Sequence, residues 1–301
     1  MATTTTSTQL TTDDAPGRFV RINGCDDIHV VVDGDLDSDV VVACVHGVPG
    51  SARDFTALGR ALRERGACCV RFDMPGFGRT LLTNSPRFSP SQRAEIVTAA
   101  MQKLGVRRFV VVGHSFGGSV ALSAAGMSTS SPAVSALVMV CAVGITRHRG
   151  LSIPHELTGL VAPLRDVPVV GARLSAPVVG FVRGTIAKLG VRGERPYSDD
   201  EIVAHTQVIG GLDFVALRHA AATVSVPALV VSARDDRLVE PATSFALVEA
   251  LSSSSSPLVS HRHMATGGHF LQRRAADPIA AWITSAVGST STTPAAYGPA
   301  L

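Results

Sequence analysis

Short runs of residues that are apolar on both faces constrain the fold of this chain more than any other feature. Val40–Val45 and Phe109–Val112 are runs of this kind. A strand with no polar face lies in the interior of a sheet that is covered on both sides, which is typical of parallel sheets. Longer, helix-like stretches such as Pro90–Leu104 lie between the runs. This alternation predicts an α/β fold with a doubly wound, mostly parallel sheet.

The remaining elements are expected on the same grounds. Two early segments, Phe19–Ile22 and Ile28–Val32, flank a turn-like Asn-Gly-Cys-Asp-Asp sequence and predict an antiparallel hairpin at the edge of the sheet. Further strands are predicted at Ala67–Phe72, Ala136–Val143, Ala228–Ser232 and Val259–His263, and further helices at Asp54–Arg65, Ser115–Ala125, Pro241–Leu251 and Pro278–Val287.

The strand–helix alternation stops after Val143 and resumes near Ala228. Residues 144–224 contain five prolines among helix-length apolar stretches, which predicts a helical cap inserted into a core formed by residues 18–143 and 225–287. Residues 1–17 and 288–301 are rich in Thr and other small residues, and we expect both to be disordered tails. The apolar residues of the insert that can cover a site are Leu160, Val161, Val169, Val170, Val179 and Phe181.

Charge and cysteine content narrow the classes of partner and compartment. The chain has 27 Lys and Arg against 24 Asp and Glu, without a basic run interleaved with aromatics, so nucleic acid is not expected as a partner. No uninterrupted apolar stretch reaches about 18 residues, so no transmembrane span is expected, although membrane contact is left open. The five cysteines are odd in number and lack a C-x-x-C spacing, which predicts a reducing, cytoplasmic location.

The segment Gly113–Gly118, with the sequence Gly-His-Ser-Phe-Gly-Gly, fits the pattern G-x-S-x-G. This pattern forms a sharp strand-to-helix turn that exposes the serine hydroxyl at the edge of a sheet. An apolar run precedes Ser115 and a stretch of small residues follows it, so the required context is present. Ser115 is therefore the candidate nucleophile.

Four further motifs accompany this one along the chain. Together the five resemble the α/β-hydrolase family, in the family's order: His46–Gly50 (His-Gly-Val-Pro-Gly), Asp73–Gly78, Gly113–Gly118, Asp235–Val239 and Gly268–Phe270. The resemblance covers roughly residues 19–143 and 225–287 and leaves the insert unmatched. It implies a hydrolase whose nucleophile is Ser115, because related enzymes that open epoxides or remove halides carry Asp at this position.

The resemblance also implies the partners of the serine. His269 corresponds to the general base, since its position near the end of the chain matches the family order Ser, Asp, His. Asp236 corresponds best to the acid that orients the base, with Asp235 as the alternative. The chain departs from the family here, because Glu240 holds the place of the usual proline and Pro241 follows one residue later.

For the oxyanion hole, the resemblance implies the backbone N–H groups of Val48 and Phe116. Pro49 has no N–H to donate, which leaves Val48, beside Gly47, as the donor from this loop. We expect His46 to brace its loop, and His114 is not a candidate base. A metal site formed by His261, His263 and His269 is disfavoured, because no carboxylate or cysteine lies at ligand spacing.

Together these residues predict a serine hydrolase that cleaves an ester, thioester or lactone of a small hydrophobic or acyl-type substrate. No cofactor is expected. The alternatives are a hydrolase-fold protein that binds a ligand with little or no turnover, and a carbon–carbon bond hydrolase or cofactor-free peroxidase of the same fold. The sequence does not identify the substrate or the oligomeric state.

Overall fold

The structure is a computed structural model that describes residues 16–22, 27–82, 88–127, 131–151, 171–188, 196–256 and 258–288. Most of the two expected tails, residues 152–170 of the expected insert, and hence Leu160, Val161, Val169 and Val170, lie outside the described residues. Across the part of the chain that the structure describes, no helix is both long and apolar enough to cross a bilayer.

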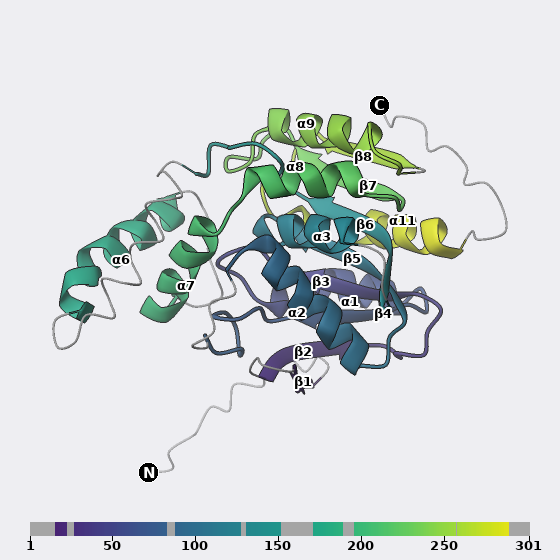
Figure 1. The fold of residues 1–301 in the computed structure, drawn as a ribbon, viewed down its shortest axis with the longest axis horizontal. Helices are drawn as coiled ribbons and strands as arrows, with labels where there is room; N and C mark the ends of the chain where they lie inside the picture. Colours follow the sequence, from purple (N-terminus) through teal and green to yellow (C-terminus); the bar gives the residue numbers. More distant parts are fainter. Residues whose placement is uncertain are drawn as a thin grey trace, which may run out of the picture.

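Eight strands form one sheet in the order β1-β2-β4-β3-β5-β6-β7-β8 (Figure 1). Antiparallel pairing is confined to β1 with β2 and β2 with β4, and the other neighbours are parallel. The predicted mostly parallel sheet and edge hairpin are therefore confirmed. The strands are β1 Gly17–Arg21, β2 Asp27–Asp33, β3 Val41–Val45, β4 Cys68–Phe72, β5 Arg108–His114, β6 Ala133–Val140, β7 Ala228–Ala233 and β8 Val259–Met264.

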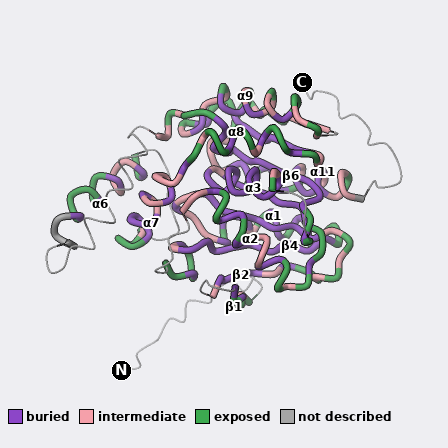
Figure 2. Tube along the Cα trace, viewed as in Figure 1, coloured by how far each residue is buried: buried purple, intermediate pink, exposed green. Residues whose placement is uncertain are grey.

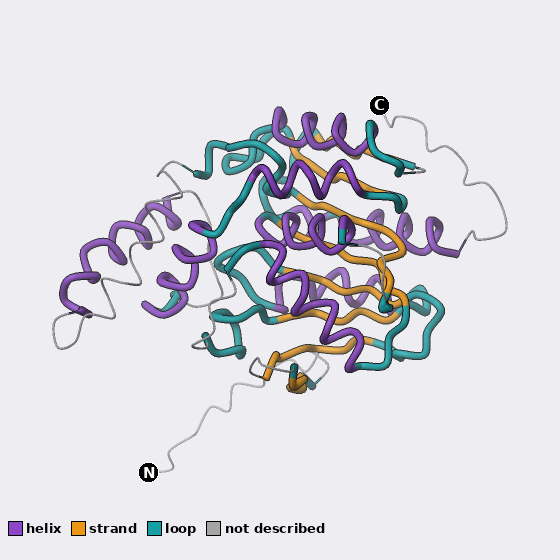
Figure 3. Tube along the Cα trace, in the orientation of Figure 1, coloured by secondary structure: helices purple, strands orange, loops and turns teal. Residues whose placement is uncertain are grey.

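Helices cover both faces of the sheet, and the central strands are buried on both sides (Figures 2 and 3). Along β3, Ala43 and Val45 point into the core beneath one helical layer, while Val42 and Cys44 point into the core on the opposite face. This alternation explains why the strand contains no polar residue. One layer contains α2 Pro90–Lys103, α3 Phe116–Gly126, α8 Phe214–Thr223 and α9 Pro241–Ser252, and the other contains α1 Thr56–Arg63 and α11 Ala276–Gly288.

Two helices between β6 and β7 stand apart from these layers, α6 Gly171–Lys188 and α7 Asp199–Gly210 (Figure 1). They share a small core in which Val179 is buried, whereas Phe181 is exposed. The third helix of this region, α8, packs against α3 and α9. It therefore lies in the main helical layer, and the boundaries of the expected insert remain a prediction.

Candidate active site

Ser115 occupies the turn between β5 and α3 in a conformation that non-glycine residues rarely adopt, with φ 52° and ψ −122°. Hydrogen bonds to the neighbouring strand and the loop beyond it hold this turn. Ser115 N donates to Val140 O at 3.0 Å, and Val143 N donates to Ser115 O at 3.0 Å. A backbone held in a costly conformation by its surroundings is a common feature of functional sites. The turn therefore has the geometry that G-x-S-x-G predicts.

The glycines of the motif are explained by close backbone contacts. A Cβ atom on Gly113 would lie 2.1 Å from Gly117 O, and a Cβ atom on Gly117 would lie 2.1 Å from Val45 O. Both contacts are far inside van der Waals distance and both involve backbone, which cannot move aside cheaply. The motif is thus a packing requirement of the site where β5, α3 and β3 meet.

Gly117→Ala is accordingly expected to lower the free energy of unfolding by at least about 2 kcal/mol, the usual scale of overpacking. Thermal melts followed by circular dichroism measure the effect. Gly180→Ala is the matched control, because open space surrounds the Cβ position of Gly180 in α6. The control should melt at or slightly above the wild-type temperature, since Ala is favoured over Gly within a helix. Equal melting of the two variants would contradict the tight crossing at Gly117.

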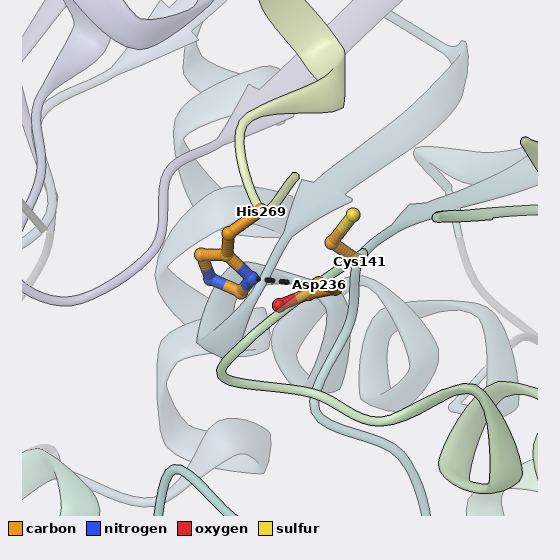
Figure 4. A group of neighbouring side chains, drawn as sticks. All are labelled: Cys141, Asp236 and His269. Atoms are coloured by element: carbon orange, nitrogen blue, oxygen red, sulfur yellow. Dashed lines mark hydrogen bonds and ion pairs between the residues drawn. The ribbon is translucent and has the colours of Figure 1, made fainter. Parts of the chain in front are cut away.

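Asp236 and His269 form a direct pair beyond the carboxyl ends of the strands (Figure 4). His269 Nδ1 lies 2.9 Å from Asp236 Oδ2, and the two side chains are only 8% and 1% exposed. Asp236 Oδ1 accepts hydrogen bonds from Leu238 N at 2.8 Å and Val239 N at 3.1 Å. Burial pushes the pKa of Asp236 upward, but the hydrogen bonds and the neighbouring imidazole outweigh it and hold the pKa below its usual range. An ionised carboxylate only accepts, so Nδ1 carries the hydrogen and Nε2 is left as the basic nitrogen.

Asp235 has a different set of partners. Its carboxylate accepts hydrogen bonds from Gly268 N at 2.8 Å and Gly267 N at 3.2 Å, and these bonds lower its pKa. Asp235 is exposed and fixes the backbone that leads into His269. Of the two candidate acids, the structure thus brings Asp236 to the imidazole and leaves Asp235 on the loop.

His114 and His46 also hold backbone. His114 Nε2 lies 2.8 Å from His269 O, and burial keeps the pKa of His114 well below its usual value, so the neutral ring donates to that carbonyl. His46 Nδ1 donates to Gly47 O at 2.6 Å while its Nε2 accepts from Met74 N at 3.0 Å. Burial lowers the pKa of His46 as well. Both rings are therefore occupied by structural hydrogen bonds.

A cavity opens above Ser115, with about 770 Å³ of space between atoms, part of it open to solvent. Ser115, Val48 and Phe116 all line it, so the candidate nucleophile and both candidate oxyanion residues share one cavity. Its other walls come from the loop after β6, the loop before α9, and helices α6 and α7. Most of the remaining lining residues are apolar: Pro49, Val143, Leu151, Val182, Ile186, Ile209, Leu238 and Val239.

Two histidines that the sequence did not single out also line this cavity. Burial lowers the pKa of His205 to about 4. It lowers the pKa of His148 too, and the Nδ1 atom of His148 lies 3.1 Å from Leu238 O, on the loop that follows Asp236. Neither histidine belongs to a sequence motif, so only the folded structure shows that both line the cavity.

The three histidines considered for a metal site do not share a single partner in the structure. His261 Nε2 and His263 Nδ1 both approach the hydroxyl of Ser232, at 2.8 and 2.9 Å, whereas His269 is bonded to Asp236. Among the described residues, the one group with ligand atoms close enough for a metal is Cys141, Asp236 and His269, within 4.8 Å of one another. Two of these three already bind each other.

Comparisons with known proteins agree with this architecture. A family model described as alpha/beta hydrolase fold matches residues 40–165. The chain is 28% identical to the "Uncharacterized hydrolase YugF" of Bacillus subtilis (strain 168), over 66% of this chain and 73% of that protein. It is 28% identical to the "Magnesium-chelatase 30 kDa subunit" of Rhodobacter capsulatus, over 84% and 88%. An esterase of Exiguobacterium antarcticum, EaEST, superposes with a TM-score of 0.69 at 16% identity, covering 91% of this chain and 100% of that one.

Proposed function

We propose that this chain, which matches the alpha/beta hydrolase fold model over residues 40–165, is a serine hydrolase in which Ser115, His269 and Asp236 act as nucleophile, base and orienting acid. The fold and the similarity to the hydrolase YugF support hydrolase activity in general. The finer proposal rests above all on one observation, the buried hydrogen bond between His269 and Asp236 at the edge of the sheet where the strained turn holds Ser115.

In the proposed reaction, Ser115 Oγ attacks the acyl carbon while His269 Nε2 takes the hydroxyl proton. The carbonyl oxygen becomes an oxyanion, to which the N–H groups of Val48 and Phe116 donate. His269 then gives its proton to the leaving group, and the carbon–oxygen or carbon–sulfur bond to that group breaks. A water molecule, deprotonated by the same nitrogen, attacks the acyl-enzyme. The acid product leaves and Ser115 recovers its proton.

Asp236 makes this proton cycle favourable in two ways. Its hydrogen bond fixes the tautomer of His269, and its negative charge stabilises the imidazolium that forms in each step. The lowered pKa of Asp236 keeps the carboxylate ionised throughout the neutral and mildly acidic range.

The cavity favours a substrate with an apolar acyl or alcohol part. Residues from α6 and α7 wall the cavity with aliphatic side chains, and Ser115 lies at its surface. Burial of such surface contributes about 25 cal/mol for each Å² removed from water. We therefore infer carboxylic esters, thioesters or lactones with a small hydrophobic part as the substrate class.

Labelling with a fluorophosphonate probe, followed by a panel of p-nitrophenyl esters of increasing acyl length, tests the proposal. The probe should modify Ser115, which mass spectrometry of the digested protein can locate. Ser119→Ala is the matched control, since Ser119 is fully buried in α3 and should not affect labelling. A wild-type protein that is neither labelled nor active would overturn the proposal.

A ligand-binding protein without efficient turnover is the second candidate. The similarity to the magnesium-chelatase subunit of Rhodobacter capsulatus favours this candidate, because the name of that relative describes no hydrolysis. Labelling of Ser115 together with absence of turnover on every ester of the panel would favour this alternative. Cleavage of a carbon–carbon bond in a substrate assayed separately from the esters would instead favour a carbon–carbon bond hydrolase.

A further inference from the structure

Cys141 lies where the two halves of the candidate site meet. It directly follows β6, whose neighbours are β5, which leads to Ser115, and β7, which leads to Asp236. Its φ is +43°, and among the described residues other than glycine only Ser115 shares a positive φ. The amide of Cys141 donates to Val231 O at 2.8 Å, which holds this conformation against β7. Such strain persists only where surrounding contacts enforce it.

The thiol of Cys141 lies beside the proposed acid–base pair (Figure 4). Its Sγ atom is 3.6 Å from Gly268 O, within hydrogen-bond distance for sulfur. Gly268 immediately precedes His269 in the chain. Sγ also lies within 4.8 Å of a carboxylate oxygen of Asp236 and of a ring nitrogen of His269. Cys141 is only 1% exposed, so water does not compete for these contacts.

The surroundings keep this thiol protonated. Burial raises the pKa of Cys141 well above its usual value, and the negative charge of Asp236 and a hydrogen bond to it raise the pKa further. A protonated thiol has one hydrogen to donate, and a weak one. The Asp236 carboxylate and the Gly268 carbonyl compete for this one hydrogen, and donation to the carbonyl at 3.6 Å leaves the carboxylate to His269.

Each of three adjacent strands sends one side chain to the backbone around His269. His114, at the end of β5, bonds His269 O. Cys141, after β6, bonds Gly268 O. Asp235, after β7, accepts from Gly268 N. The peptide groups on both sides of the His269 Cα atom are thus fixed, which determines where the imidazole can reach.

We propose that Cys141 is a positioning residue, whose S–H group fixes the Gly268 carbonyl and thereby sets His269 against Asp236. This role rests on the proposed serine hydrolase function, because it concerns the alignment of the base used in that reaction. Cys141 does not contact the substrate. Its contribution is geometric, and misplacement of a catalytic group by about 1 Å can cost as much as 10²-fold in rate.

Cys141→Ala and Cys141→Ser separate the hydrogen bond from simple packing. In Cys141→Ala, kcat for an ester substrate should fall roughly 10- to 10²-fold with KM little changed, because the base and not the binding cavity is disturbed. In Cys141→Ser, a donor is restored and most of the kcat should return. Nuclear magnetic resonance gives a readout that needs no turnover: the downfield proton of the His269–Asp236 hydrogen bond should broaden or shift in Cys141→Ala and persist in Cys141→Ser.

Cys44→Ala is the matched control, because Cys44 is a fully buried thiol in the same hydrophobic core but pairs with Cys69, at 3.4 Å. It should lower the melting temperature while leaving kcat and the downfield proton unchanged. Wild-type kcat and an unchanged proton in both Cys141 variants would overturn the proposal. Equal losses in both variants would overturn it too, since the donor would then be irrelevant. Failure of the proposed function is distinguishable, because an inactive, unlabelled wild type would still report the proton.

Discussion

Ser115→Ala is expected to lower kcat by about 10⁶-fold, the scale on which loss of the nucleophile acts when the triad works as a unit. The physical reason is that no other group is available to form the acyl-enzyme, while the cavity and the oxyanion donors remain. Initial rates on the best ester of the panel measure the effect. Fluorophosphonate labelling should disappear with the rate.

The fold should survive this change, because the backbone of the turn is set by its glycines and by hydrogen bonds to main-chain atoms at residue 115. Ser115→Gly provides a second test of the same site. It should be as inactive as Ser115→Ala but more stable, since a non-glycine residue at positive φ costs about 1–2 kcal/mol. Wild-type hydrolysis by either variant would contradict the mechanism as a whole.

The core of the fold was predictable because a strand that is buried on both faces consists of consecutive apolar residues. The strands β3, β4, β5 and β7 fall within one or two residues of the predicted runs. Hydrophobicity was a poor guide to the end of β6, which was predicted at Ala136–Val143 and is found at Ala133–Val140. Residues 141–143 are apolar because they are buried beyond the carboxyl end of β6, although the chain has already turned at Cys141.

The candidate site likewise contains residues that the sequence predicts and residues that only the folded structure brings together. Ser115 and His269 belong to motifs whose local turns need particular residues, so their positions can be predicted from the sequence. The positions of Cys141 and His148 near the site depend instead on which strands are neighbours and on which loops meet over them. A single cysteine or histidine carries no spacing signal for such contacts. The cavity wall was hardest to predict, because Val179, one of the insert residues expected to cover the site, packs inside the α6–α7 core.

Asp236→Asn should lower kcat by about 10⁴-fold, the loss seen when the corresponding acid of the serine-protease triad is replaced in the same way. An asparagine side chain can still approach His269 Nδ1, but it no longer carries charge. It favours the wrong imidazole tautomer if its amide donates. The base nitrogen that should face Ser115 would then be protonated in the resting enzyme. KM should change little, because Asp236 does not line the cavity.

Asp235→Asn is the matched comparison, since it makes the same chemical change one residue away. Asp235 accepts hydrogen bonds from Gly267 N and Gly268 N, whereas the imidazole is bonded to Asp236, so an asparagine oxygen at residue 235 can keep one of the two backbone bonds. Its kcat should therefore fall by about tenfold at most, the lower end of what misplacing a catalytic group costs. Thermal melts of both variants establish that the loops are intact. A greater loss in Asp235→Asn than in Asp236→Asn would assign the acid to Asp235, against the 2.9 Å contact between Asp236 and His269.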